Sequence, residues 1–134
     1  MVGSLPCVAP ACKVHAAIGF AIVGGWAVLF LWGLGAFIVK REPNQWFWRL
    51  LAVLQVLLIL QLVAGVTLLA LGHRADSLLH YGYGALFPAI VLVIAHVFAR
   101  DMEAESDTWK VFAVASFFIF GLTLRALTTG LGLP

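Results

Sequence analysis

The chain has 134 residues, of which 63% are hydrophobic and only 10% are charged, and its formal net charge at pH 7 is +2. A soluble domain keeps roughly a quarter of its residues charged, so this composition excludes a soluble globular protein and indicates a protein that lies in a bilayer. The small net charge and the lack of a basic run exclude nucleic acid as a partner.

Four apolar runs are each long enough to cross a membrane, which takes about 20 residues in a helix. We expect these helices over residues 14–39, 47–71, 79–99 and 109–129. The runs are continuously apolar rather than alternating, which excludes a membrane β-barrel. Because the connections are short, consecutive helices should pack antiparallel. The sequence therefore predicts one all-α domain, residues 1–134, folded as an integral membrane four-helix up-and-down bundle.

The connections carry residues that typically end and begin helices. Pro43 should end the first helix, and Gly72 should cap the second. Asp76 or Ser77 should begin the third helix, and Asp107–Thr108 should cap the fourth.

Lysine and arginine indicate the orientation. The side with the first and third connections carries five basic residues, namely Lys40, Arg41, Arg49, Arg100 and Lys110. The opposite side carries three, namely Lys13, Arg74 and Arg125. The positive-inside rule then places both termini outside. No cleavable signal peptide is evident, so the first span should also direct insertion, and we expect a bacterial inner membrane.

Two short phrases place a histidine four residues before a glycine at the start of an apolar run: His15 with Gly19, and His80 with Gly84. An ionisable residue entering a membrane segment is costly and is a candidate functional residue. The two helices run in the same direction and are diagonal neighbours, so both imidazoles should face the bundle axis near the outer surface. Imidazole binds iron well, and a glycine one turn deeper on the same face leaves room for a flat macrocycle. The sequence predicts one haem b between His15 and His80.

Two further residues belong to this prediction. Arg125 lies near the outer end of the fourth helix, where it can pair with a haem propionate or snorkel to the headgroups. Pro88 clashes with the carbonyl of Gly84 and should kink the third helix.

The remaining polar residues have open roles. His73 is expected as an exposed loop residue, with a proton carrier, a propionate partner and a metal ligand as alternatives. His96 lies about 24 Å along the helix from His80 and on another face, so it should be an interfacial residue outside the haem site. Cys7 and Cys12 precede the first span and are a pair of unremarkable thiols in a mobile tail, a disulfide, or a soft-metal site with His15.

With His15 and His80 on parallel, non-adjacent helices and Arg125 at the same level, the arrangement resembles four-helix membrane b-type cytochromes, in particular one half of a haem A synthase. The resemblance implies a haem near the outer surface between these histidines. No predicted span contains a carboxylate, whereas the synthase active site would lead one to expect one paired with a histidine. This departure counts against synthase activity and leaves simple haem binding open.

These observations favour an integral membrane b-type haem protein that transfers electrons within or beside a respiratory or photosynthetic complex, because two histidine ligands leave no open iron position. Its expected surroundings are the lipid bilayer, a quinone or other membrane subunits. The alternative is a cofactor-free structural or accessory subunit of a larger membrane complex, in which the histidines bond to neighbours or lipids.

Overall fold

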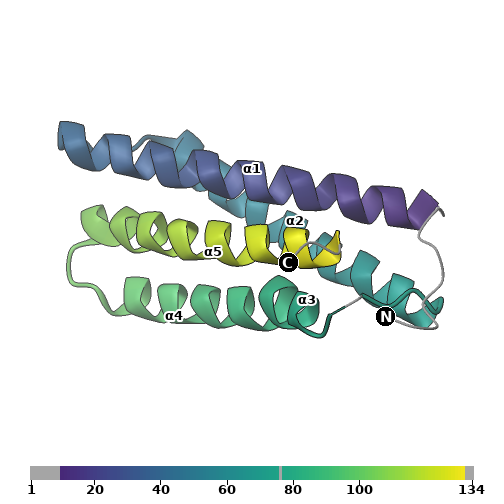
Figure 1. Ribbon diagram of the computed structural model, residues 1–134. Helices are drawn as coiled ribbons and strands as arrows, with labels where there is room; N and C mark the ends of the chain where they lie inside the picture. Colours follow the sequence, from purple (N-terminus) through teal and green to yellow (C-terminus); the bar gives the residue numbers. More distant parts are fainter. Residues whose placement is uncertain (1–9, 76, 132–134) are drawn as a thin grey trace.

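The computed structural model of the protein describes residues 10–75 and 77–131 and is helical along most of that length (Figure 1). The helices are α1 (Pro10–Val39), α2 (Gln45–Ala70), α3 (Leu79–Tyr81), the π-helix η1 (Gly82–Leu86), α4 (Phe87–Asp101), the 3₁₀-helix η2 (Glu105–Asp107) and α5 (Thr108–Gly130). Four continuous segments are long and apolar enough to cross a membrane: Cys12–Val39, Gln45–Ala70, Leu79–Asp101 and Glu105–Gly130. The predicted all-α four-helix fold is confirmed, and each predicted span differs from the observed one by only a few residues at its ends.

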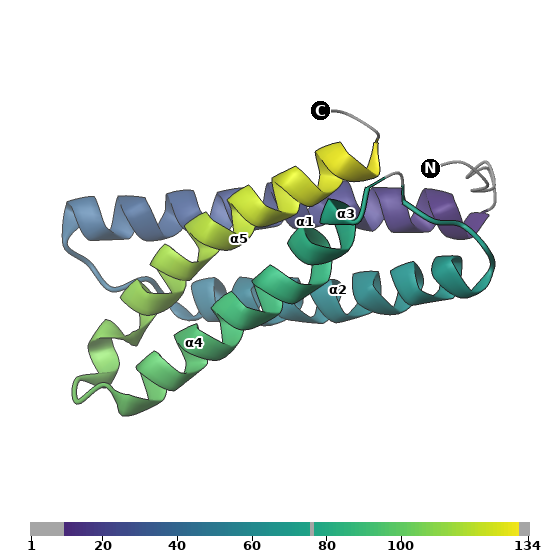
Figure 2. The same cartoon turned by 60° about the horizontal axis from the view of Figure 1, so that its bottom comes forward.

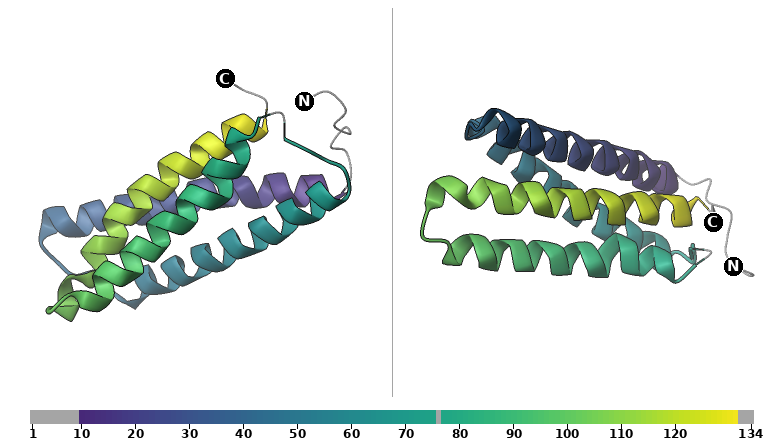
Figure 3. Two further views of the ribbon diagram at one scale, coloured as in Figure 1. Left: turned by 90° about the horizontal axis from the view of Figure 1, so that it is seen from below. Right: turned by 60° about the vertical axis from the view of Figure 1, so that its left-hand side comes forward.

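The spans form two antiparallel hairpins that cross at an angle (Figures 2 and 3). Helix α1 packs on both α2 and α5, and α4 packs on α5, so the packing order is α2, α1, α5, α4. Helices α2 and α4 make little or no direct backbone contact, and the same holds for α1 and the third span. The bundle is therefore open along the flank between α2 and α4.

The two ends of the bundle are filled differently. From the middle of the bundle to the end where η2 lies, Trp26, Leu29 and Phe47 are fully buried. An edge-to-face contact between Trp48 and Phe112, with centroids 5.6 Å apart, joins α2 to α5. Membrane helices are held together by close packing rather than by water exclusion. Large aromatic rings supply many of the van der Waals contacts that such packing needs. The opposite end contains a cavity, and its wall includes four glycines, Gly19, Gly65, Gly84 and Gly130.

The outward faces of the helices carry exposed apolar side chains, among them Phe37, Ile59 and Val93. Such a surface is stable where lipid tails rather than water cover it. Composition and surface together make this a multi-pass membrane protein.

The predicted caps are confirmed in part. Gly72 adopts a φ of 92° after α2, and His73 N–H donates to Leu68 O at 2.9 Å, as a Schellman cap requires. Ser77 Oγ accepts from Leu79 N–H at 3.1 Å at the start of the third span, while Asp76 lies outside the described residues. The prediction for Asp107 is wrong: it occupies the N-cap position of α5, but its carboxylate does not cap the helix and instead pairs with Lys110 Nζ at 3.0 Å.

Pro88 affects the third span differently from a simple kink. Proline has no N–H to donate to the carbonyl of Gly84, and its ring crowds that carbonyl. The chain responds by widening into the π-helix η1, in which Phe87 N–H donates to Gly82 O, five residues back. The third span therefore changes helical register between His80 and α4.

Candidate functional site

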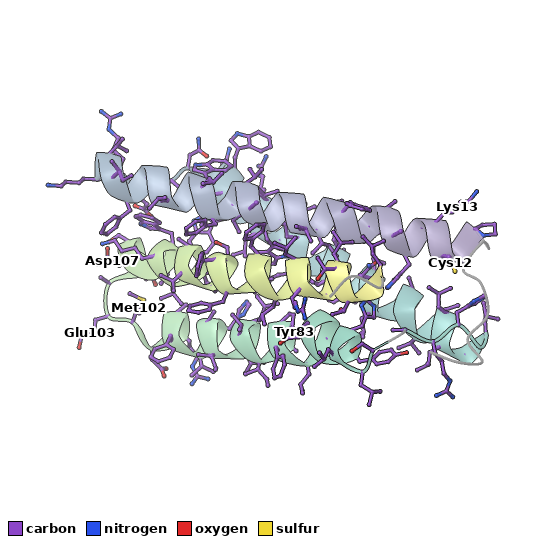
Figure 4. The ribbon with its side chains drawn as sticks, viewed as in Figure 1. Cys12, Lys13, Tyr83, Met102, Glu103 and Asp107 are labelled. Carbon is purple, nitrogen blue, oxygen red and sulfur yellow. The ribbon has the colours of Figure 1, made fainter. Side chains whose placement is uncertain are left out.

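A cavity of about 260 Å³ lies at the end of the bundle where α1 begins and α2 ends. Its wall comes from α1, α2, α5, the α3–η1 segment and the loop over residues 73–75. This is the end that carries Cys12 and Lys13, opposite the end that carries Glu103 and Asp107 (Figure 4). Most side chains in the wall are apolar. The polar ones are His15, Gln61, His73, Arg74, His80, Tyr81 and Thr123.

Two histidines from different spans meet in this cavity. His15 of α1 and His80 of α3 have ring centroids 6.0 Å apart, with the ring planes at 72°. Both side chains are half-buried. The structure therefore brings together the two histidines that the sequence analysis paired.

The separation of these rings suits one metal ion between them. A metal–imidazole bond is about 2.0 Å long, so imidazoles on opposite sides of one metal have centroids roughly 6 Å apart. Among the residues that the structure describes, no group of three or more His, Cys, Asp or Glu is placed to hold a metal, whereas a bare zinc ion takes three or four protein ligands. Two histidines alone suit a metal that brings its other ligands with it, as iron does in a porphyrin.

The hydrogen bond of His80 is compatible with metal binding by its other ring nitrogen. Its Nδ1 lies 2.8 Å from Ala126 O on α5. A carbonyl only accepts, so Nδ1 carries a proton, and in the neutral ring Nε2 keeps a free lone pair. Metal-binding histidines commonly donate their second N–H to a backbone carbonyl in this way. Gly130 also lies against this ring, because a Cβ there would be 2.8 Å from His80 Cε1.

The surroundings of His15 are less complete. Its Nδ1 is buried without a hydrogen-bond partner. Gly65 of α2 lies against the ring, since a Cβ there would be 3.3 Å from His15 Cε1. Gln61 of α2 reaches across and donates from Nε2 to His15 O at 2.7 Å. Gln61 therefore bonds across the helices from α2 to α1, and the bond ends on the backbone of a candidate ligand.

The glycines singled out in the sequence line the cavity but contact other helices. A Cβ on Gly19 would lie 3.2 Å from Gln61 Nε2, and one on Gly84 would lie 3.5 Å from Ala126 Cβ. Gly19 therefore makes room for the glutamine amide, whereas a Cβ on Gly84 would make only an ordinary contact with α5. The glycines that touch the imidazoles are Gly65 and Gly130, which the sequence analysis did not single out.

The cationic side chains of the cavity differ from those expected. Arg125 is half-buried on α5 but is not among the residues that line the cavity. His73 and Arg74 do line it, and His73 is half-buried, so the expectation of an exposed loop histidine is wrong. The loop that carries them is tied to α3, because Ala75 N–H donates to Tyr81 Oη at 3.0 Å.

His96 lies outside this site, as expected. Its Nδ1 bonds to Leu92 O of its own helix at 2.7 Å, and its ring packs on Phe112 with centroids 5.0 Å apart. The side chain is exposed. It is therefore a surface histidine at the opposite end of the third span.

Cys12 lies inside α1, is buried and is disulfide-bonded. The reading of this residue as a thiol in a mobile tail is wrong, and a disulfide also leaves it no thiolate with which to bind a metal. Cys7 lies outside the described residues. Disulfides persist in oxidising compartments, which bears on the orientation of this end of the bundle.

Comparison of the chain with known family models, curated proteins and solved structures found no match.

Proposed function

We propose that this multi-pass membrane protein binds one haem b, which His15 and His80 would hold by its iron, and passes single electrons. The observation that carries the proposal is the 6.0 Å separation of the two rings inside an apolar cavity at one end of the bundle. A haem with two histidine ligands supplies one-electron redox chemistry and leaves no open position for oxygen.

The size of the cavity determines how the macrocycle would lie. Its 260 Å³ is below the roughly 300–1,000 Å³ of ordinary small-molecule pockets. A porphyrin would need more room than this, and the open flank beside α2 offers it, because Leu62 and Val66 line the cavity there and are exposed. Apolar side chains on this flank suit the apolar edge of the ring.

The two propionate carboxylates of a haem need cationic or hydrogen-bonding partners in the protein. Arg74 is the guanidinium in the cavity wall, next to His73, and a guanidinium binds a carboxylate through two parallel hydrogen bonds. We therefore assign the propionates to the 73–75 loop rather than to Arg125.

We also propose that both termini lie outside. Two independent observations support this orientation: five of the eight basic residues fall on the side of the first and third connections, and Cys12 at the opposite end is disulfide-bonded. A bacterial inner membrane, and a quinone or other membrane subunits as electron partners, remain predictions.

The test is a reduced-minus-oxidised visible spectrum of protein purified in detergent from cells supplied with haem. We expect a b-type signal at one haem per chain that is lost in both His15→Ala and His80→Ala, because each substitution removes one axial ligand. His96→Ala is the matched control and should keep the full signal.

A colourless, helical wild-type preparation would contradict haem binding and favour the cofactor-free subunit. A signal that survives in both single variants would show that the haem binds elsewhere.

A further inference from the structure

The orientation of the Gln61 amide is fixed by its partner. Its Nε2 lies 2.7 Å from His15 O, and a carbonyl oxygen only accepts, so the nitrogen must face it. The close approach is possible because Gly19 has no side chain, since a Cβ there would lie 3.2 Å from this nitrogen. Oε1 is therefore left as the free end of the amide.

Two buried polar atoms in this wall lack partners: Gln61 Oε1 and His15 Nδ1. Both belong to residues that line the cavity and that a hydrogen bond already joins. Buried polar atoms in proteins are nearly always paired, with protein groups or with ordered water. Because the two unpaired atoms belong to residues that contact each other across two helices, they are candidates for a hydrogen bond to one another.

Their chemistry is complementary in one state of His15. If Nε2 of His15 binds a metal, Nδ1 carries the proton and becomes a donor, while Gln61 Oε1 is an acceptor. Two other donors in the wall bond elsewhere, because Thr123 Oγ1 donates to Ile119 O at 2.7 Å and His80 Nδ1 to Ala126 O at 2.8 Å. Gln61 is thus matched to the metal-binding tautomer of His15.

We propose that Gln61 is the positioning residue of His15: its Oε1 accepts the Nδ1–H of His15, directly or through one water, and so holds Nε2 towards the metal. This inference rests on the proposed function. Gln61 would then do for His15 what Ala126 O does for His80, namely accept the Nδ1–H. Each of the two candidate ligands would have a fixed tautomer. A hydrogen-bonded ligand of this kind is more basic and favours ferric over ferrous iron.

The experiment compares Gln61→Leu, Gln61→Glu and wild type as full-length, haem-loaded protein in detergent. Gln61→Leu removes the acceptor, so we expect a higher midpoint potential and haem affinity lowered roughly 10- to 100-fold, as for other such partners. Gln61→Glu offers a stronger acceptor and should lower the potential. Gln55→Leu is the matched control on the same helix. Gln55 Nε2 bonds to Leu51 O of its own helix at 3.3 Å, and Gln55 lies outside the cavity wall. The haem in this variant should have the same midpoint potential as in wild type.

A midpoint potential unchanged in Gln61→Leu, or shifted in the same direction in Gln61→Leu and Gln61→Glu, would overturn the inference and leave Gln61 as a tie between α2 and α1. Absence of a haem signal in wild type would instead count against the proposed function. In that case ¹⁵N NMR of His15 in the haem-free protein decides the positioning role. An Nδ1-protonated tautomer that is lost in Gln61→Leu supports it, and a tautomer that does not change overturns it.

Discussion

At the scale of single residues, space beside the two imidazoles is controlled by Gly65 and Gly130. A Cβ on Gly130 would lie 2.8 Å from His80 Cε1 and 3.0 Å from Nδ1, closer than side chains normally approach. Such a contact can be relieved only by moving the imidazole or the end of α5, because protein interiors have little free space to absorb it. Either movement disturbs the bond between His80 and Ala126 O.

We therefore expect Gly130→Ala to lower haem affinity by about tenfold or more, the loss typical when the surroundings of a ligand are disturbed. Gly121→Ala on the same helix is the control, because a Cβ there meets nothing within 4 Å. It should bind haem normally and stabilise α5 by about 0.5–1 kcal/mol, since alanine favours a helix over glycine. Haem titration and thermal unfolding measure the two effects, and equal affinities for the two variants would contradict this role of Gly130.

The sequence identifies the histidines but not the residues around them. His15 and His80 stand out because ionisable residues are rare in apolar spans. Which glycine faces which ring depends on how the hairpins cross, and one turn of helix offers several small residues. For that reason the sequence predicts Gly19 and Gly84 beside the macrocycle and does not distinguish Gly65 and Gly130 from the other glycines of the spans.

At the scale of elements, the third span determines where His80 points. The π-helix η1 lies directly between His80 and α4 and inserts an extra residue into the turn. One extra residue rotates the preceding segment by about 100° relative to the rest of the helix. π-helices are commonly found at functional sites, and here the extra residue sets the direction of a candidate ligand.

Pro88→Ala should test this arrangement. Alanine supplies the N–H that can bond to Gly84 O, so the π-helix should revert to α-helix and turn His80 away from His15. We expect an unchanged or higher unfolding temperature together with loss of most of the bound haem, measured by circular dichroism and by the haem spectrum. Pro43→Ala, in the connection between α1 and α2, is the control and should keep the haem. Full haem binding by Pro88→Ala would show that the contacts of α3 alone fix His80.

The spans were predictable because length and hydropathy alone define a membrane helix. The caps at Gly72 and Ser77 were also predictable, since each depends on a local side chain or backbone conformation. The π-helix was not, because a proline in a span can be accommodated by a kink or by a wider turn. The ion pair of Asp107 with Lys110 likewise could not be separated from a capping role by sequence alone.

At the scale of the whole molecule, charge and covalent chemistry divide the bundle into two ends. The end with the cavity carries the disulfide-bonded Cys12, and the opposite end carries acidic residues such as Glu103 and Asp107 beside most of the basic ones (Figure 4). The acidic residues contribute little to orientation, which the basic residues dominate.

Labelling of single introduced cysteines with a membrane-impermeant maleimide tests the orientation. Arg74→Cys should react in intact cells, and Glu103→Cys should react only after the membrane is opened, because both positions are exposed but at opposite ends. The wild-type chain, in which Cys12 is disulfide-bonded, gives the background. The reverse pattern would place the termini inside.

The position of the histidine pair at one end has an energetic consequence. The other end of the described bundle offers only His96, whose ring nitrogen bonds to its own helix. If a haem binds between His15 and His80, the described residues provide one redox site, near one face of the bilayer. A partner on that same face would then exchange electrons with it without moving charge across the membrane. The direction of that exchange would depend on the redox potentials of the two proteins and not on the membrane potential.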